Sequence, residues 1–384
     1  MNTEMTYEVV DSAESFEKLL ARVREAQKIY STYTQEQVDK IFRAAAMAAN
    51  LQRIPLAKMA VEETGMGCVE DKVIKNHYAA EYIYNAYKDT KTCGVIEEDA
   101  SYGIKKIAEP MGLVGAIIPT TNPTSTAIFK CLICLKTRNA ILISPHPRAK
   151  KCTAEAARIV REAAEAAGAP KGLIDCIENP TLELSNELMR SADVILATGG
   201  PGMVKAAYSS GKPAIGVGPG NTPVIMDSSC DIQLAVYSVI HSKTFDNGMI
   251  CSSEQAAIVD AAIYDEVKAE FEAHQCVIIS KKADIAKLEK VVLNEARTAV
   301  NGAIVGHSAI EIAEKAGLKV PAGTKMLLAE IPDATMEHPL ALEKLSPVLI
   351  LIKSDGVEDG FKKVEGVLNL GGIGHTAVIH TENE

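Results

Sequence analysis

The chain has 384 residues and a net charge of −10, with 47% hydrophobic and 23% charged residues, as is ordinary for a folded soluble protein. Its length is too great for one ordinary hydrophobic core and predicts two domains. The negative charge argues against non-specific attraction to nucleic acid or to an anionic membrane. No apolar stretch is long enough to span a bilayer, and the N-terminus lacks the basic-then-apolar pattern of a secretory signal. Nine scattered cysteines, an odd number, favour a reducing cytoplasm over a disulfide framework.

The first part of the chain is predicted to be helical. Apolar residues recur at helical spacing over residues 16–26, behind Asp11, and Glu14 follows Asp11 by three residues as in a capping box. Further helices are expected to begin near Thr34, at Pro55 and at about Val69. The helix that begins at Pro55 is expected to end at Gly65.

Beyond this region the pattern changes to strands. Residues 93–108 are predicted to form a β-hairpin with an acidic turn at residues 97–99. Helices are expected at residues 125–135 and 153–167, between short apolar runs. The predicted strands are residues 113–118, 140–143, 173–177, 194–197, 214–217 and 224–226.

Short apolar strands that alternate with helices indicate an α/β fold with a doubly wound, Rossmann-type parallel sheet. Ligands on such sheets bind beyond the carboxyl ends of the strands. We expect this first domain to cover residues 1–230, including the hairpin. A second α/β domain is expected over residues 231–384, with its own strands at residues 254–259, 277–279 and 348–352.

Three loops that follow predicted strands hold candidate binding residues. Asn122 follows the first of these strands, and taken alone it is more simply a turn or cap residue than an amide that stabilises an oxyanion. His146 lies between two prolines, either as a surface residue or against a cofactor. Thr198, Gly199 and Gly202 open a helix where backbone N–H groups can approach a phosphate, although the spacing is not G-x-G-x-x-G and is a weak signal alone.

Three further features carry groups that do chemistry. Cys251 follows a turn that contains Gly248 and precedes an apolar strand; most such cysteines fill cores, but a turn can expose a nucleophile. His375, in a glycine-rich loop, is either a base or a structural loop histidine. The Cys131-x-x-Cys134 pair lies in an apolar helix without a matching second pair, so it is interpreted as core and no metal site is expected.

Taken together these segments resemble the aldehyde dehydrogenase superfamily, and in it the aldehyde dehydrogenase half of bacterial bifunctional aldehyde–alcohol dehydrogenases. The matching segments follow the family's order from the middle of the chain almost to its end. They are residues 118–130 (IPTTNPTSTAIFK), 144–150, 197–207, 242–255, 343–347 and 371–376.

The resemblance implies a role for each candidate. Cys251 resembles the catalytic nucleophile, Asn122 the oxyanion-hole amide that acts with the Cys251 backbone N–H, and His375 is expected to assist as an acid–base group. Glu343 resembles the glutamate that holds the nicotinamide ribose. The residues expected to meet the NAD cofactor are Pro119, Thr120, His146, Thr198, Gly199, Gly202 and Glu343.

One departure from the family decides the expected reaction. Hydrolytic members carry a glutamate base in the segment that is residues 215–219 here, and this segment has no carboxylate. Without a base that activates water, the acyl-enzyme is expected to pass its acyl group to a better nucleophile, the thiol of coenzyme A. The resemblance therefore implies an NAD-dependent acetaldehyde dehydrogenase that produces acetyl-CoA through a thioester on Cys251.

Two other interpretations stay open. One is a CoA-dependent succinate-semialdehyde dehydrogenase of the same fold, and the other is an inactive structural protomer of a filament. The family's catalytic domain continues past the point where this chain ends, at Glu384, so a C-terminally truncated catalytic domain is expected. The family forms homo-oligomers through such a hairpin and tail, and we expect this association to be weakened here.

Overall fold

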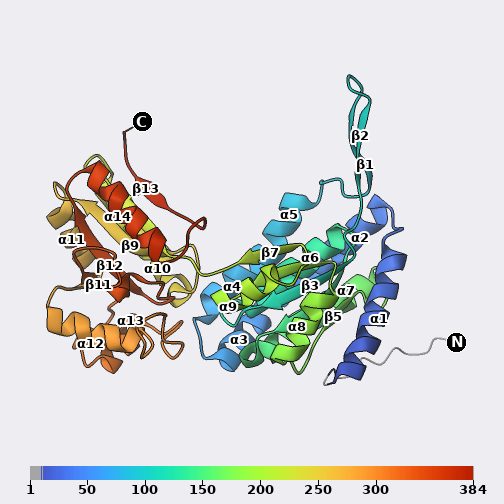
Figure 1. Cartoon of the computed structure of the whole chain (residues 1–384), viewed down its shortest axis with the longest axis horizontal. Coiled ribbons are helices and arrows are strands. Elements are labelled where there is room, and N and C mark those ends of the chain that lie inside the picture. The colour runs from blue at the N-terminus through green and yellow to red at the C-terminus, as the bar shows by residue number, and fades with distance from the viewer. Residues whose placement is uncertain (1–9, 11, 384) are drawn as a thin grey trace. The chain divides into compact units, whose positions relative to one another are not determined.

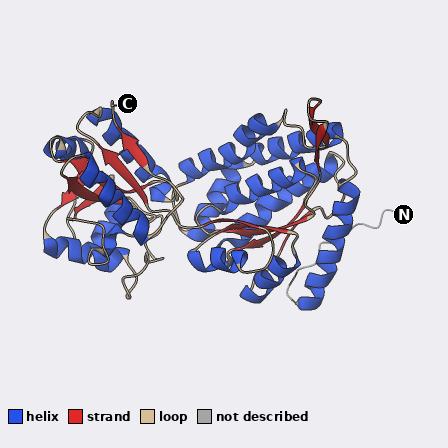
Figure 2. Ribbon diagram, turned by 45° about the horizontal axis from the view of Figure 1, so that its top comes forward, coloured by secondary structure: helices blue, strands red, loops and turns tan. Residues whose placement is uncertain are grey.

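A computed structural model of the chain describes residue 10 and residues 12–383. These residues form two compact units. Unit 1 comprises Met1–Gly65 and Val69–Gly218, and unit 2 comprises Met66–Cys68 and Pro219–Glu384. Each unit has its own parallel sheet among helices, which confirms the expected α/β fold with two α/β domains (Figure 2). Over the described residues, no helix is both long and apolar enough to cross a membrane.

The sheet of unit 1 is doubly wound. Its strand order is β5-β4-β3-β6-β7, and all neighbours are parallel. From β3 the chain moves outward to β5 and then returns to the other side of β3, so the direction of winding switches between β3 and β6. The strands are β3 (Leu113–Ile118), β4 (Ala140–Pro145), β5 (Ile174–Cys176), β6 (Val194–Thr198) and β7 (Ala214–Val217).

Right-handed crossovers place the helices of this sheet on opposite faces according to the direction of winding. The two helices after β3 and β4 therefore cover one face, and the two after β5 and β6 cover the other. These helices are α6 (Pro123–Lys136), α7 (Lys150–Ala166), α8 (Leu182–Ser191) and α9 (Pro201–Tyr208), with a short 3₁₀ turn, η2 (Pro147–Ala149), before α7.

The first two helices of unit 1 begin at polar side-chain caps. The first is capped by Ser12, which forms a capping box with Ser15; the expected cap, Asp11, lies outside the described residues. Thr34 caps the second, as expected, and Gly65 ends the third in a left-handed conformation. The helices are α1 (Ala13–Tyr30), α2 (Gln35–Leu51), α3 (Arg53–Thr64), α4 (Val69–His77), the π-helical turn η1 (Tyr78–Tyr82) and α5 (Ile83–Tyr87).

The hairpin consists of β1 (Gly94–Asp99) and β2 (Ile104–Ala108), paired antiparallel. It extends away from the helices of unit 1 (Figure 1). The expected acidic turn is wrong, because Glu97 and Glu98 lie within β1 opposite Lys106 and Lys105. Cross-strand ion pairs of 2.8 Å and 3.0 Å keep these residues in the ladder, and the turn falls at residues 100–103.

Unit 2 contains a six-stranded sheet in the order β10-β11-β12-β9-β8-β13. Residues of β12 alternate between two hydrophobic clusters, so this strand is buried on both faces. The strands are β8 (Thr222–Met226), β9 (Glu254–Asp260), β10 (Cys276–Ile279), β11 (Met326–Glu330), β12 (Val348–Ser354) and β13 (Val378–His380). The helices are α10 (Ile232–Thr244), η3 (Phe245–Gly248), α11 (Tyr264–Ala273), α12 (Lys282–Val292), α13 (Ala309–Lys315), η4 (Pro339–Ala341) and α14 (Val357–Leu370).

The structure changes the predicted domain boundary in one respect. The division falls at Gly218–Pro219, not after residue 230, because β8 pairs with β9 and β13 in the second sheet. Its apolar residues had been assigned to the first sheet. A second segment of unit 2, Met66–Cys68, comes from the N-terminal part of the chain and was not anticipated.

A buried carboxylate joins α1 to the edge of the unit 1 sheet. Asp175 of β5 accepts from Arg22 at 2.5 Å and from Arg161 at 3.5 Å. Burial raises the pKa of Asp175, and the Cys176 N–H and the two guanidinium groups oppose this effect. Removing one of its cationic partners therefore leaves a buried charge less well compensated.

We expect Arg22→Met to lower the free energy of unfolding by about 2 kcal/mol, since Asp175 stays buried after its nearer partner is lost. Lys18→Met is the matched control on the same helix. It breaks the exposed Lys18–Glu14 pair and should change stability by less than about 0.5 kcal/mol. Urea denaturation followed by circular dichroism measures both. Equal, small effects would show that the buried pair adds nothing to stability.

Candidate active site

The turn that delivers Cys251 is held by contacts on both sides. Asp246 and Asn247 in η3 have left-handed backbone angles, with φ of 49° and 52°, which Asp and Asn tolerate better than most residues. The Cys68 N–H donates to Asp246 Oδ1 at 2.9 Å, and Asn247 Nδ2 donates to the Gly306 carbonyl at 2.9 Å. Cys251 follows as a half-buried residue just before β9. The turn therefore holds Cys251 in a defined and partly exposed position.

Gly220 lies directly against this cysteine. A β-carbon at Gly220 would come 1.9 Å from the carbonyl oxygen of Cys251 and 3.4 Å from Cε1 of His375. The Gly220 N–H donates to Glu343 Oε1 at 3.0 Å. Unit 2 therefore brings together three of the predicted site residues, namely Cys251, His375 and Glu343. Any side chain at position 220 would displace the backbone of the cysteine.

The glycine-rich loop before His375 approaches the same place. Gly372 has a φ of 79°, and a β-carbon there would lie 2.4 Å from the backbone nitrogen of Asn221. Only glycine permits both this conformation and this contact. His375 Nδ1 forms a 2.8 Å hydrogen bond with Thr376 Oγ1, which leaves Nε2 as the ring nitrogen for exchange with a substrate proton.

Behind Glu343 lies a buried polar cluster that the sequence did not reveal. Gln255 Oε1 accepts from Lys243 Nζ at 2.8 Å and from the Lys344 N–H at 3.1 Å. Lys344 Nζ donates to two backbone carbonyls of the η4 segment, those of Leu340 and Leu342. Lys243, Gln255 and Lys344 have no exposed surface. In the sequence, lysines beside a carboxylate look like surface residues, so no local pattern marks this cluster.

Burial sets the protonation equilibria of this cluster. It raises the pKa of Glu343 to about 7, against the lowering effect of the Gly220 N–H, Lys243 and Lys344. Burial also lowers the pKa of Lys243 to about 7, and that of Lys344 well below its usual value. The charge on Glu343 therefore changes near neutral pH.

In unit 1, the sheet brings the other predicted residues to one edge. β4, β3 and β6 are neighbours and parallel, so the loops after them meet at their common carboxyl edge. Pro119, Thr120 and Asn122 follow β3, and His146 follows β4. Thr198 is the last residue of β6, and Gly199 and Gly202 follow it. Beneath this edge the buried Lys130 donates to the carbonyls of Ile117 and Leu196 at 2.8 Å and 2.7 Å, joining β3 to β6.

The glycines after β6 leave space for the phosphate of a ligand to approach the protein backbone. A β-carbon at Gly200 or Gly202 would meet no atom within 4 Å, and one at Gly199 would make only ordinary contacts. None of the three has a positive φ. Neither packing nor backbone conformation therefore requires glycine here, and open space beside the N-terminus of α9 suits a dinucleotide phosphate.

His146 has a local structural role. Its Nδ1 accepts from the Arg148 N–H at 3.1 Å and so caps η2. Burial lowers the pKa of His146, and the neighbouring Arg148 lowers it further, so both effects favour the uncharged ring. A cofactor contact through its other ring nitrogen is compatible with this geometry, and that assignment stays a prediction.

Asn122 does not act as an ordinary helix cap. It occupies the N-cap position of α6, but its side chain makes no capping hydrogen bond. Instead Asn122 Oδ1 accepts from Lys75 Nζ of α4 at 2.7 Å. The same helix holds the loop through Lys72 Nζ, which donates to the Thr121 carbonyl at 3.1 Å, and through Asn76, which accepts from Thr124. No local pattern in the sequence indicates this contribution of α4.

Cys131 and Cys134 lie in the core of unit 1, as expected from their apolar helix. Burial raises the pKa of Cys134 to about 12, and that of Cys131 well above its usual value. Both therefore stay protonated and unreactive near neutral pH.

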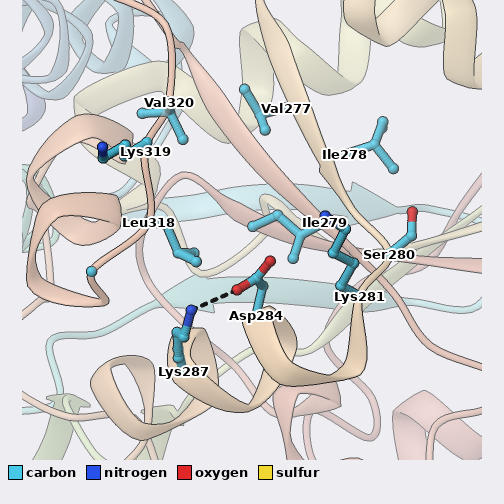
Figure 3. Close-up of a pocket in the computed structure, with 11 residues that line it drawn as sticks. Val277, Ile278, Ile279, Ser280, Lys281, Asp284, Lys287, Leu318, Lys319 and Val320 are labelled. Carbon is cyan, nitrogen blue, oxygen red and sulfur yellow. Dashed lines mark hydrogen bonds and ion pairs between the residues drawn. The ribbon is translucent and has the colours of Figure 1, made fainter.

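Unit 2 also has a hollow of about 550 Å³ beside its edge strand β10 (Figure 3). An ion pair of 2.8 Å between Asp284 and Lys287 lies on its wall. None of the predicted site residues is among those that line it, which are Val277, Ile278, Ile279, Ser280, Lys281, Asp284, Lys287, Gly317, Leu318, Lys319 and Val320. The hollow is thus separate from the Cys251 site.

Comparison with known proteins identifies the family of the chain that forms this site. Residues 3–334 match the model of the aldehyde dehydrogenase family. The chain belongs to the aldehyde dehydrogenase family.

Two relatives are similar over most of this chain. It is 58% identical to the bifunctional aldehyde-alcohol dehydrogenase AdhE of Escherichia coli (strain K12) over 368 residues, which are 95% of this chain and 41% of that protein. It is 40% identical to the succinate-semialdehyde dehydrogenase (acetylating) of Clostridium kluyveri over 370 residues, 96% of this chain and 81% of that protein. The chain therefore spans about two fifths of the length of the E. coli relative.

Solved structures of the family superpose closely. An acetylating aldehyde dehydrogenase from Geobacillus thermoglucosidasius has a TM-score of 0.94 and 49% identity, covering 96% of this chain and 82% of that one. A propionaldehyde dehydrogenase from Rhodopseudomonas palustris, with bound CoA and an acylated cysteine, has a TM-score of 0.86 and 30% identity. That match covers 98% of this chain and 84% of that one.

We expect Gly220→Ala to lower aldehyde dehydrogenase activity about 100-fold, because its β-carbon would displace the Cys251 carbonyl, and small misplacements of a reacting group have effects of this size. Gly218→Ala is the control, since its β-carbon would have no neighbour closer than 4.0 Å. Steady-state rates and a melting temperature should be recorded for both. Similar activity in the two variants would mean that Gly220 does not position the cysteine.

The raised pKa of Glu343 predicts a pH dependence of dinucleotide binding. A carboxyl group with a pKa of about 7 is protonated as pH falls through 7, and it then accepts ribose hydroxyls less well. The dissociation constant for NADH should therefore rise several-fold between pH 8 and pH 6. Glu343→Gln should bind weakly at every pH, whereas the exposed Glu365→Gln should keep the wild-type profile. A pH-independent wild type, measured by NADH fluorescence, would contradict this assignment.

Proposed function

We propose that this chain is a CoA-acylating aldehyde dehydrogenase that interconverts acetaldehyde, coenzyme A and NAD with acetyl-CoA and NADH. The observation that carries the proposal is the arrangement in unit 2, where Cys251, Gly220, Glu343 and His375 meet. It supplies a nucleophile, a cofactor-binding carboxylate and an acid–base group. The segment over residues 215–219, where hydrolytic relatives carry their glutamate base, has no carboxylate.

In the oxidative direction, the Cys251 thiolate attacks the aldehyde carbon. The amide of Asn122 and the backbone N–H of Cys251 donate to the oxyanion that forms. Bound NAD supplies the hydride acceptor, and Cys251 keeps the acyl group as a thioester. The CoA thiol then attacks this thioester and gives its proton to His375, and the bond from the acyl carbon to Cys251 breaks, which releases acetyl-CoA and the Cys251 thiolate. Without a carboxylate that activates water, CoA is the acyl acceptor.

The cofactor assignments have support in both units. The open glycine segment after β6 suits the phosphates of NAD, and Glu343 suits its nicotinamide ribose. Pro119, Thr120, His146 and Thr198 are proposed to complete the NAD site from the carboxyl edge of the unit 1 sheet. The CoA and the acylated cysteine of the R. palustris enzyme support coenzyme A as the second substrate.

Succinate semialdehyde is the second candidate substrate, because the C. kluyveri relative is named for it. The two candidates differ by a carboxylate, which needs a cationic partner in the substrate site. Comparison of kcat/KM for acetaldehyde and succinate semialdehyde distinguishes them. A chain that binds NAD but turns over neither substrate would favour the filament protomer.

The proposal also covers the cellular compartment of the enzyme and the association of its copies. A reducing compartment keeps free cysteines from forming disulfides, which favours the cytoplasm. The exposed β1–β2 hairpin supports association between copies of the chain, because an isolated two-stranded hairpin is only marginally stable in water.

Cys251 is expected to be the one cysteine that carries the acyl group. Incubation with acetyl-CoA should add one acetyl group to the wild type, and peptide mapping by mass spectrometry should locate it on Cys251. Cys251→Ala should abolish both the adduct and the oxidation of NADH by acetyl-CoA. Cys93→Ala, which removes another half-buried thiol, should change neither.

The dependence on CoA tests the reaction type in the same preparations. Steady-state oxidation of acetaldehyde should require CoA and yield a thioester. Rapid CoA-free turnover to acetate would show that a base activates water and that the proposal is wrong. An acetyl adduct on the Cys251→Ala variant would overturn the assignment of the nucleophile.

A further inference from the structure

Helix α4 is hydrogen-bonded to the loop that carries Asn122. Three of its residues form hydrogen bonds with residues 121–124. Lys72 binds the Thr121 carbonyl, Lys75 binds the Asn122 side chain, and Asn76 accepts from Thr124 Oγ1 at 2.8 Å. Directly after α4 the backbone forms the π-helical turn η1, a feature that often occurs at functional sites.

The Lys75 contact selects one orientation of the Asn122 amide. An amide presents an oxygen that accepts and a nitrogen that donates, whereas an ammonium group only donates. Lys75 Nζ, at 2.7 Å, can therefore bind Oδ1 but not Nδ2. One hydrogen of Nδ2 donates to Thr121 Oγ1 at 3.2 Å, and the second remains for another acceptor.

Without Lys75, the side-chain oxygen of Asn122 is free to cap helix α6. Asparagine at an N-cap normally turns its side-chain oxygen toward the first N–H groups of the helix. Here this capping bond is absent, although Asn122 occupies the N-cap position of α6. The lysine thus withdraws Oδ1 from the helix. A cation bound to an amide oxygen also polarises the amide, which makes its N–H groups stronger donors.

We propose that Lys75 is a positioning residue of the active site, which orients and polarises the Asn122 amide so that Nδ2 donates to the oxyanion. The inference rests on the proposed function of Asn122 as an oxyanion donor. Lys75 acts through the amide and does not itself contact the reacting atoms. Lys72 differs, because it holds the backbone carbonyl of Thr121 and leaves the orientation of the amide unaffected.

A double-mutant cycle tests whether Lys75 works through Asn122. Lys75→Met should lower kcat for the oxidation of NADH by acetyl-CoA about 10-fold to 100-fold, with KM for NADH changed less than about twofold. This loss is smaller than the roughly 100-fold to 1,000-fold cost of removing an oxyanion donor itself, because the Asn122 amide remains. In the Asn122→Ala background the same substitution should cost less than about twofold. Lys75→Arg should retain part of the activity, because arginine also only donates to the amide oxygen.

An equal loss of kcat from Lys75→Met in both backgrounds would overturn the proposal, since Lys75 would then act independently of Asn122. The melting temperature separates this result from a folding defect, and Lys75→Arg supplies a second variant with a cation of similar reach. Unchanged kcat in Lys75→Met would also overturn it.

A crystal structure of Lys75→Met gives a readout that needs no activity. Asn122 Oδ1 is expected to turn and accept from an N–H in the first turn of α6. An Asn122 amide that keeps its orientation would overturn the proposal. Failure of the proposed function is distinct, because it would appear as a wild-type enzyme without acetyl transfer to Cys251.

Discussion

The close approach of Gly220 to the carbonyl of Cys251 is the constraint on which the catalytic unit depends. The space between them is too small for a β-carbon, so two backbone segments lie in direct contact. One segment continues into β8 and the other into β9, and these strands are neighbours in the sheet. The Gly220 N–H then binds Glu343, and the His375 loop lies against the adjoining Asn221. The pairing of two strands thus sets where Cys251, Glu343 and His375 meet.

The charges behind Glu343 make this arrangement stiff. Two fully buried lysines have few partners for the N–H groups of their side chains, and each lost hydrogen bond leaves a polar group buried without water. Lys243 binds Gln255 on β9, and Lys344 binds carbonyls of the η4 segment. The strand after the nucleophile and the loop of Glu343 are therefore held together. Such networks define position more than they add stability.

Unit 1 uses lysines in the same way at its carboxyl edge. Lys130 joins the ends of β3 and β6, while Lys75 holds the amide of the loop after β3. Burial lowers the pKa of Lys130 to about 7, so its ammonium form has a cost, which the hydrogen bonds to the two strand carbonyls help to offset. In both units, lysines bound to oxygen acceptors position backbone and amide groups that the proposed chemistry needs.

Local features of the sequence determined most of the elements. The all-apolar runs at residues 113–118 and 214–217 predicted β3 and β7 to the residue, and Thr34 marked the start of α2. The flanks of Cys251 and Glu343 indicated the family, because side chains around a reacting group are constrained by chemistry. The sequence did not determine which of the two sheets each strand joins. Residues 224–226 suit a buried strand in either sheet, and only pairing with β9 and β13 assigns β8 to unit 2.

Tertiary structure alone decided what the polar residues do. Residues 326–330 were not identified as a strand, since a short apolar run resembles a buried helix segment until neighbouring strands pair with it. Asn122 is a cap by position, yet Lys75, 47 residues earlier, determines the direction of its amide. Periodicity and propensity depend on neighbours along the chain, and so the sequence determined where most elements lie and that Cys251 precedes a strand. The partner of a buried charge or amide depends on residues far apart in sequence, and only the folded structure could decide it.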